Sequence, residues 1–323
     1  MPRKNGGLCL SLLALLLLAG CVSAPQTAEL LKQSQEKYSK PVLLGAVPFF
    51  SQEAYQCGPA ALAMMLNASG LDSSPMALVP LVYVPERKGS FQVEMVAATR
   101  SAGRLAYEIP PAMTALFAEV AAGQPVLVLQ NLGLSWYQRW HYAVVVGFDL
   151  PRRKIILNSG QLEHYEISLS TFEHTWARSQ HWAMLVLVPG VMPVTADPLH
   201  YFSAVVALEK NNPAPMVGTA YQSGLQRWPH DRTLMMGYAN LQYAEKNLAT
   251  ADALFRSVIL EHPDYAPAFN NLAQVQFESG DPVAALSNAR KAVELGGEYL
   301  PIFLATLQTI TADPPARLPV PRI

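Results

Sequence analysis

Cys57 lies directly before an apolar helical run in the stretch "QEAYQCGPAALAMML", residues 52–66. Pro59 suits the first turn of that helix, where no amide hydrogen is needed. Amide groups at a helix N-terminus favour an anion, so we expect the pKa of the Cys57 thiol to fall. The side-chain amide of Gln52 is placed to stabilise a developing oxyanion. The alternative is a small buried cysteine without chemistry, but the neighbouring Gly58 and Pro59 favour a nucleophile.

A thiolate nucleophile also needs a base and a group that orients the base. His141 heads the strand-like run "HYAVVVGFD", and Asn158 lies in the next run, "KIILNSG". A hairpin between these runs would place Asn158 near His141. Asp149, at the end of the first run, is the alternative third member. We therefore predict a Cys57–His141–Asn158 triad, with Gln52 as an oxyanion donor.

The elements that must position these residues lie between about residues 41 and 190. Helical patterns over 60–70, 90–103 and 111–123 each end at a glycine. Runs rich in β-branched residues follow, namely "PVLVLQN", "HYAVVVGFD", "KIILNSG" and "HWAMLVLVP". Helices first and strands afterwards predict an α+β domain with a mainly antiparallel sheet.

Cys, His and Asn in this chain order resemble the papain-like cysteine peptidases. The sequence is most similar to the double-glycine leader peptidase family, the domains that trim bacteriocin precursors. Gln52, the run Cys57-Gly58-Pro59-Ala60 and His141 match that family's motif, and the resemblance covers about residues 45–190. That family usually has Asp, often followed by Pro, where this chain has Asn158 and Ser159. The resemblance implies a papain-like fold and a cysteine endopeptidase that prefers small residues before the cut.

A 34-residue period begins after a linker at residues 191–197. Pro229 and Pro263, and likewise Ala251 and Ala285, are separated by this interval. The pattern resembles tetratricopeptide repeats and predicts units at 198–231, 232–265 and 266–299, a capping helix at 300–311 and a tail at 312–323. Such an all-α solenoid forms a groove for a peptide substrate or a protein partner. The sequence does not fix whether Tyr238, Asn240 and Asn271 line it.

The first twenty residues have the layout of a secretory signal that ends in "LLAGC". This ending resembles the lipobox of bacterial lipoproteins, which implies lipid on Cys21, a tether over residues 21–40 and a position on the periplasmic side of an outer membrane. An ordinary cleaved signal is the alternative. With Cys9 removed and Cys21 lipidated, Cys57 is left as the only thiol.

Composition limits the partners. A formal net charge of −1 and the lack of a basic run argue against nucleic acid. The histidines show no ligand spacing and there are no cysteine pairs, so we predict neither a metal nor a cofactor. Two alternatives to hydrolysis remain at this point: a catalytically inactive scaffold lipoprotein that acts through its repeats, and acyl transfer from Cys57 to an amine.

Overall fold

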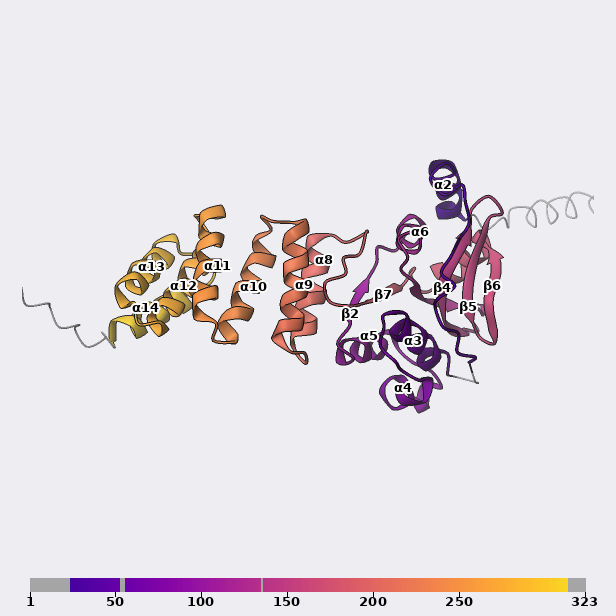
Figure 1. Ribbon diagram of the computed structural model, residues 1–323, viewed down its shortest axis with the longest axis horizontal. Helices are drawn as coiled ribbons and strands as arrows, with labels where there is room; N and C mark the ends of the chain where they lie inside the picture. The colour runs from indigo at the N-terminus through magenta and orange to yellow at the C-terminus, as the bar shows by residue number, and fades with distance from the viewer. Residues whose placement is uncertain (1–23, 53–55, 135, 313–323) are drawn as a thin grey trace, which may run out of the picture.

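The structure, a computed structural model, describes residues 24–52, 56–134 and 136–312. An N-terminal domain contains a β-sheet with helices, and a C-terminal array of helices extends away from it (Figure 1). The predicted signal segment, Cys21 and the tail from residue 313 onward lie outside the described residues.

Seven strands form one sheet in the order β2-β7-β3-β4-β5-β6, and β1 also pairs with β4. All of these described pairs are antiparallel. The strands are β1 (Val42–Leu43), β2 (Leu105–Glu108), β3 (Val126–Asn131), β4 (Trp140–Asp149), β5 (Lys154–Ser159), β6 (Leu162–Ser168) and β7 (Ala183–Leu187). The predicted α+β domain with an antiparallel sheet is confirmed.

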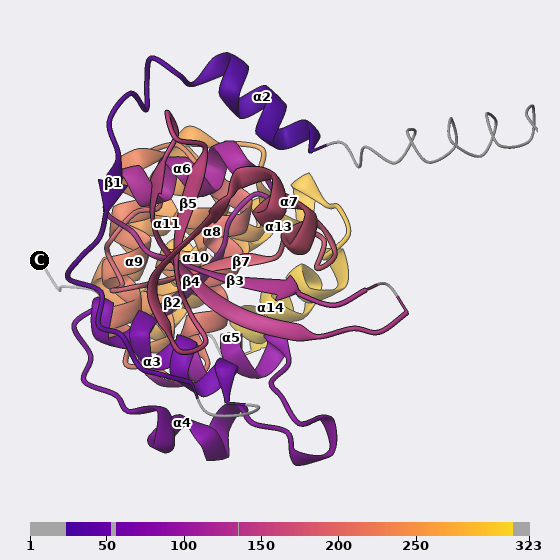
Figure 2. The same cartoon turned by 90° about the vertical axis from the view of Figure 1, so that its right-hand side faces the viewer.

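Helices cover both faces of the sheet, and each face has its own apolar core (Figure 2). One face carries α2 (Pro25–Gln33), α6 (Met113–Ala121) and α7 (Leu169–Ala177). The other carries α3 (Cys57–Ala68), α4 (Pro75–Val82) and α5 (Gln92–Ser101). Residues that alternate along β4 therefore point into different cores, because successive side chains of a strand point to opposite faces.

Strand β4 is the longest described strand, and it lies between β3 and β5 in the sheet. It pairs with β3 at His141 and with β5 at Val144. A β-bulge between Val145 and Gly147 changes the register with β5. A Cβ atom at Gly147 would lie 2.3 Å from the carbonyl oxygen of Val42, so β1 can reach β4 only because this residue is glycine.

The expectation of a tether over residues 21–40 is wrong for its described part. Helix α2 packs on α6 and α7, and both Leu30 and Tyr38 are buried in the core beneath it. The amides of Gln26 and Thr27 donate to the Glu173 carboxylate at 2.9 and 2.6 Å. A carboxylate at a helix N-terminus satisfies free amides and favours the helix dipole. The segment therefore belongs to the domain.

The C-terminal helices form three successive pairs and one final helix within the described chain. They are α8 (Pro198–Glu209), α9 (Ala214–Arg227), α10 (Arg232–Ala244), α11 (Leu248–Glu261), α12 (Ala266–Glu278), α13 (Pro282–Leu295) and α14 (Leu300–Ala312). The pairs begin 34 residues apart, at Pro198, Arg232 and Ala266. Alanines at the predicted small positions, such as Ala251 and Ala285, are fully buried and allow the helices to approach closely. The tetratricopeptide-type solenoid is confirmed.

The first helix pair is part of the core of the sheet domain. Tyr201, Leu208 and Tyr221 belong to the same buried cluster as Tyr107 of β2. The segment between the two regions is bound as well: the fully buried Glu119 carboxylate accepts hydrogen bonds from the amides of Val194 and Thr195 and from the Thr195 hydroxyl. The predicted linker therefore joins the two regions firmly.

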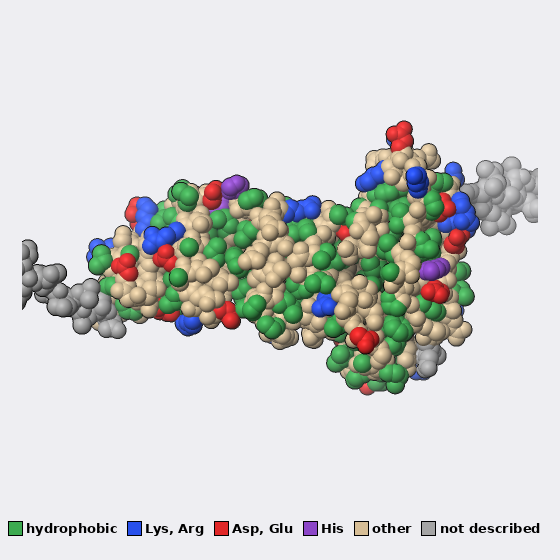
Figure 3. Space-filling view, viewed as in Figure 1, with side chains coloured by type: hydrophobic (Ala, Val, Ile, Leu, Met, Phe, Trp, Pro, Cys, Tyr) green, Lys and Arg blue, Asp and Glu red, His purple; other side chains and the backbone are tan. Residues whose placement is uncertain are grey.

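Charged side chains are sparse over α8 and α9 on the face seen in Figure 3, and they gather on the far repeats and on α2. No helix among residues 24–52, 56–134 and 136–312 has the length and hydropathy needed to cross a bilayer. The same residues contain no group of three potential metal-binding side chains.

Candidate active site

Helix α3 places Cys57 at its first position, against β4. Every residue from Gly58 to Leu66 is buried, so the helix is held on all sides by apolar contacts. Gly58 is required by close packing, because a Cβ atom there would lie 2.2 Å from the Ser90 hydroxyl oxygen. Cys57 itself is half-buried and is not part of a disulfide. Cys57, the free cysteine of the described residues, thus lies at the start of a closely packed helix.

The surroundings of the Cys57 sulfur favour the protonated thiol. Burial raises the pKa of Cys57 above its ordinary value, while hydrogen bonds from the backbone amides of Tyr142, Gly58 and Cys57 itself lower it in part. The expected fall of this pKa is therefore wrong for the resting site. The amides do point at the sulfur, but the loss of solvent around it outweighs them.

His141 lies one residue before the Tyr142 amide that reaches the sulfur. Its Nε2 atom is 2.8 Å from the Ser159 hydroxyl oxygen. Burial lowers the pKa of His141 to about 4, and the positive charge of Arg139 adds to the decrease. The imidazole is therefore neutral near pH 7 and can accept a proton. No hydrogen bond joins Cys57 to His141 in the described part of the chain, and the hydrogen bond described for the imidazole is the one between Nε2 and Ser159.

The structure brings Ser159, and not Asn158, to His141. Asn158 is fully buried and pairs with Val144, on the face of the sheet opposite to Ser159. Its Oδ1 atom accepts a hydrogen bond from the amide of His164 at 3.1 Å, which fixes the turn into β6. Its Nδ2 atom has no partner among the described residues. Alternation along β5 explains why the neighbour of the predicted residue makes the contact.

Asp149 is wrong as the alternative third member. It lies eight residues from His141 on the same strand, a separation of roughly 25 Å. There it accepts a hydrogen bond from the amide of Arg152 at 3.0 Å and pairs with Lys154 across the hairpin. Its role is in the turn between β4 and β5.

Gln52 lies beside the thiol's amide partner. Its side-chain Nε2 atom is 3.5 Å from the carbonyl oxygen of Tyr142, and its own amide donates to the Gly160 carbonyl. The side chain is buried, and its Oε1 atom has no hydrogen bond partner among the described residues. Gln52, Cys57 and the start of β4 thus meet at one end of the sheet.

Residues 45–184 match the Peptidase_C39 like family. Among solved structures, a protein described as a C39-like peptidase from Bacillus anthracis is 18% identical, with a TM-score of 0.40 over 46% of this chain and 98% of that chain. The Yersinia enterocolitica type III secretion chaperone SycD, solved with a peptide of the translocator YopD, is 14% identical, with a TM-score of 0.35 over 38% of this chain and 98% of its own. YrrB, a TPR protein, is 20% identical, with a TM-score of 0.33 over 36% of this chain and 60% of its own. No curated protein sequence matches the chain significantly.

Three polar side chains of the C39-like domain were not predicted from the sequence. Ser159 could not have been found by counting alternate residues along the hairpin from His141, because the β-bulge between Val145 and Gly147 moves the register by one residue. No motif marks Tyr142 or Glu94, and each has a buried oxygen without a hydrogen bond partner among the described residues. Burial raises the pKa of Tyr142, and the negative charges of Cys57 and Glu94 add to this increase. Glu94 therefore lies close enough to Tyr142 for its charge to act on the phenol.

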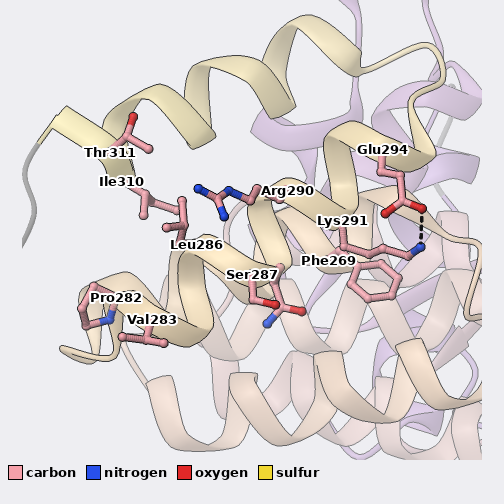
Figure 4. Close-up of a pocket in the computed structure, with 11 residues that line it drawn as sticks. Phe269, Pro282, Val283, Leu286, Ser287, Arg290, Lys291, Glu294, Ile310 and Thr311 are labelled. Atoms are coloured by element: carbon pink, nitrogen blue, oxygen red, sulfur yellow. Dashed lines mark hydrogen bonds and ion pairs between the residues drawn. The ribbon is translucent and has the colours of Figure 1, made fainter.

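A second hollow lies far from Cys57, at the end of the solenoid. A groove of about 950 Å³ runs between α13 and α14 (Figure 4). Leu286, Ile310 and Phe269 form its apolar part, Arg290 lines it with positive charge, and Lys291 forms an ion pair with Glu294 at 2.9 Å. Tyr238, Asn240 and Asn271 lie elsewhere: Asn271 donates to Asn240 at 2.9 Å, and Tyr238 accepts from Gln222.

Proposed function

We propose that the C39-like domain hydrolyses peptide bonds through Cys57, with His141 as the general base. Two observations support this: backbone amides are directed at a thiol at a buried helix start, and the neutral imidazole of His141, held through Nε2, lies one residue before the Tyr142 amide that reaches the sulfur. The lowered pKa of His141 keeps its imidazole unprotonated near pH 7, as a general base requires, although the same desolvation makes the ring a weaker base.

In the proposed reaction, His141 takes the proton of the Cys57 thiol as the sulfur attacks the carbonyl carbon of a peptide. The Gln52 side-chain amide and the Cys57 backbone amide donate hydrogen bonds to the oxyanion. His141 then gives the proton to the leaving amine, and an acyl-enzyme remains on the sulfur. Water, deprotonated by His141, releases the carboxylic acid and restores the thiol. Ser159 holds the imidazole through these steps, with Asn158 supporting the strand end.

A peptide library with mass spectrometric readout tests this proposal on the purified chain. We expect cleavage by the wild type and none by Cys57→Ala. Intact-mass analysis after a short reaction should show an acyl adduct on Cys57. If the products carry an added amine in place of water, the reaction is acyl transfer. If the wild type and Cys57→Ala give the same products, the proposal fails.

A second candidate function is a C39-like binding module without catalysis. It is favoured by the protonated resting thiol and by the lack of a described hydrogen bond between Cys57 and His141. In this case peptides from the same library would bind without being cut, and Cys57→Ala would bind them equally well. Calorimetric titration of the bound peptides separates the two functions.

We further propose that the repeats recruit a protein substrate or partner. The groove between α13 and α14 suits an apolar segment with an acidic side chain, because Leu286 and Ile310 are apolar and Arg290 is positive. A photoreactive amino acid in place of Val283, which lines this groove, should cross-link to the segment that binds it. Cross-links from a control at Leu260, an exposed position on α11, should be absent.

Finally, we propose that Cys21 carries lipid and holds the chain on the periplasmic side of an outer membrane. The order of Arg3 and Lys4, an apolar core and the small residues before Cys21 supports this assignment. The mass of the mature N-terminal peptide should include the lipid chains. Cys21→Ser should remove that mass and release the protein from the membrane fraction.

A further inference from the structure

The hairpin that joins β3 to β4 carries a cluster of exposed apolar side chains. Trp136 is 81% exposed and Tyr137 is 64% exposed, and Leu132, Leu134 and Trp140 are each about half exposed. We call these five residues the aromatic hairpin tip. Large apolar side chains that gather in one place on a surface mark a site of interaction.

Part of the hairpin backbone forms hydrogen bonds within the hairpin. The amides of Leu132 and Leu134 donate to the carbonyls of Arg139 and Tyr137. The side-chain oxygen of Asn131 accepts two further hairpin amides, both at 2.9 Å. Unpaired backbone groups are costly in a layer of low polarity, so this pairing lowers the cost of contact with the interfacial layer, where headgroups and water can pair with the remaining groups.

The charges at the base of the hairpin are positive. Residues 131–141 contain no carboxylate, and Arg139 is their only ordinarily charged residue. Arg178 of the loop after α7 adds a second guanidinium, which donates to the carbonyls of Asn131 and Gly133. Two cations beside exposed Trp and Tyr side chains are the arrangement that favours an anionic membrane surface.

The hairpin projects from the sheet as a finger beyond the helices, on the same side of the molecule as the N-terminal end of α2 (Figure 2). We propose that the aromatic hairpin tip inserts into the interfacial layer of an anionic phospholipid bilayer. Indole and phenol rings place their apolar part among the acyl chains and their polar part among the headgroups. A projecting finger suits a deformable surface, and this contact does not depend on the proposed hydrolysis.

Quenching of tryptophan fluorescence by brominated acyl chains tests this contact on the full chain. Vesicles of phosphatidylglycerol and phosphatidylcholine with bromine on their acyl chains should quench the wild type. The double variant Trp136→Phe/Trp140→Phe should lose most of this quenching, because these are the exposed indoles. Trp228→Phe, on the solenoid, is the matched control and should keep it. This quenching reports the depth of the hairpin tip in the bilayer, even if another part of the chain also binds the vesicles.

Charge and specificity give a second measurement. Arg139→Gln should weaken the quenching in anionic vesicles and leave it unchanged in vesicles of phosphatidylcholine alone. Equal quenching of the wild type and of Trp136→Phe/Trp140→Phe would overturn the proposal. A Leu134→Ser/Trp136→Ser variant, shown by thermal melting to be folded, gives a second test. If it keeps its contact with vesicles and has a higher KM for a soluble peptide, the tip binds substrate and the proposal is overturned.

Discussion

At the scale of single residues, burial shifts the pKa values of Cys57 and His141 in opposite directions. It raises the pKa of the thiol and lowers that of the imidazole, because each charged form loses solvation. Near pH 7 the resting pair is therefore neutral. The thiolate and imidazolium forms are both unfavourable in the free enzyme. We therefore expect proton transfer to accompany attack on the substrate.

Alkylation of Cys57 by iodoacetamide should therefore be slow at neutral pH. We expect its rate to rise with a midpoint above the ordinary cysteine value of about 8.5. His141→Gln should leave that midpoint high, because the imidazole is neutral where the thiol titrates. The measurement follows the mass of the peptide that contains Cys57 in the folded protein. A midpoint several pH units lower in the wild type, raised by His141→Gln, would show an ion pair instead.

The acid limb of kcat/KM should report the proton on His141 in the free enzyme. Protonation removes the base, so activity should fall as pH decreases through about 4. Arg139→Gln removes a positive charge beside the ring, which favours the imidazolium and should move the acid limb to higher pH. A limb near the ordinary histidine value of about 6.5 that Arg139→Gln does not move would contradict this account.

Ser159 and Asn158 should have separable effects. Ser159→Ala removes the hydrogen bond to Nε2 and should lower kcat roughly tenfold, as expected for the loss of one neutral hydrogen bond. Ser159→Thr keeps the hydroxyl and should restore much of the rate. Asn158→Ala removes the bond to the His164 amide and should act mainly on stability, measured by urea unfolding. The opposite result, a larger loss of kcat from Asn158→Ala, would support the predicted triad.

At the scale of elements, the position of α3 depends on a close contact at Gly58. Gly58→Ala forces the new methyl group against the Ser90 hydroxyl, and we expect a loss of about 1–3 kcal/mol in the free energy of unfolding. The double variant Gly58→Ala/Ser90→Gly should recover most of it. Gly218→Ala in α9, where the nearest atom is 3.6 Å away, is the matched control and should not destabilise. Equal losses at both glycines would refute the contact.

Periodicity and local signals made the major elements predictable. The apolar runs around Ala60, Val128 and Val145 indicate α3, β3 and β4, and the 34-residue interval indicates the helix pairs. The short strands β1 and β2 carry few residues each and depend on tertiary pairing. The choice between Asn158 and Ser159 depended on the β-bulges, which change the register without a sequence signal. The pKa of Cys57 depended on burial, which no local pattern contains.

At the scale of the whole molecule, the sheet domain and the first helix pair should unfold as one unit. A chain that ends at Pro193 would expose Leu105 and Tyr107 of β2, which α8 covers, and should lack a cooperative urea transition. A chain that ends at Pro263 keeps α8 to α11 and should retain the near-ultraviolet circular dichroism of the sheet domain. Cooperative unfolding of the shorter chain would disprove the shared core.

The same cluster has a consequence for the order of synthesis. Leu30 and Leu241 are both members of it, so one core is assembled from residues near the start of the chain and from the second repeat. A ribosome delivers these residues in sequence, and domains that depend only on earlier residues can fold as they emerge. Here the nascent sheet domain has to wait, with its apolar surface uncovered, until α8 to α10 have been made.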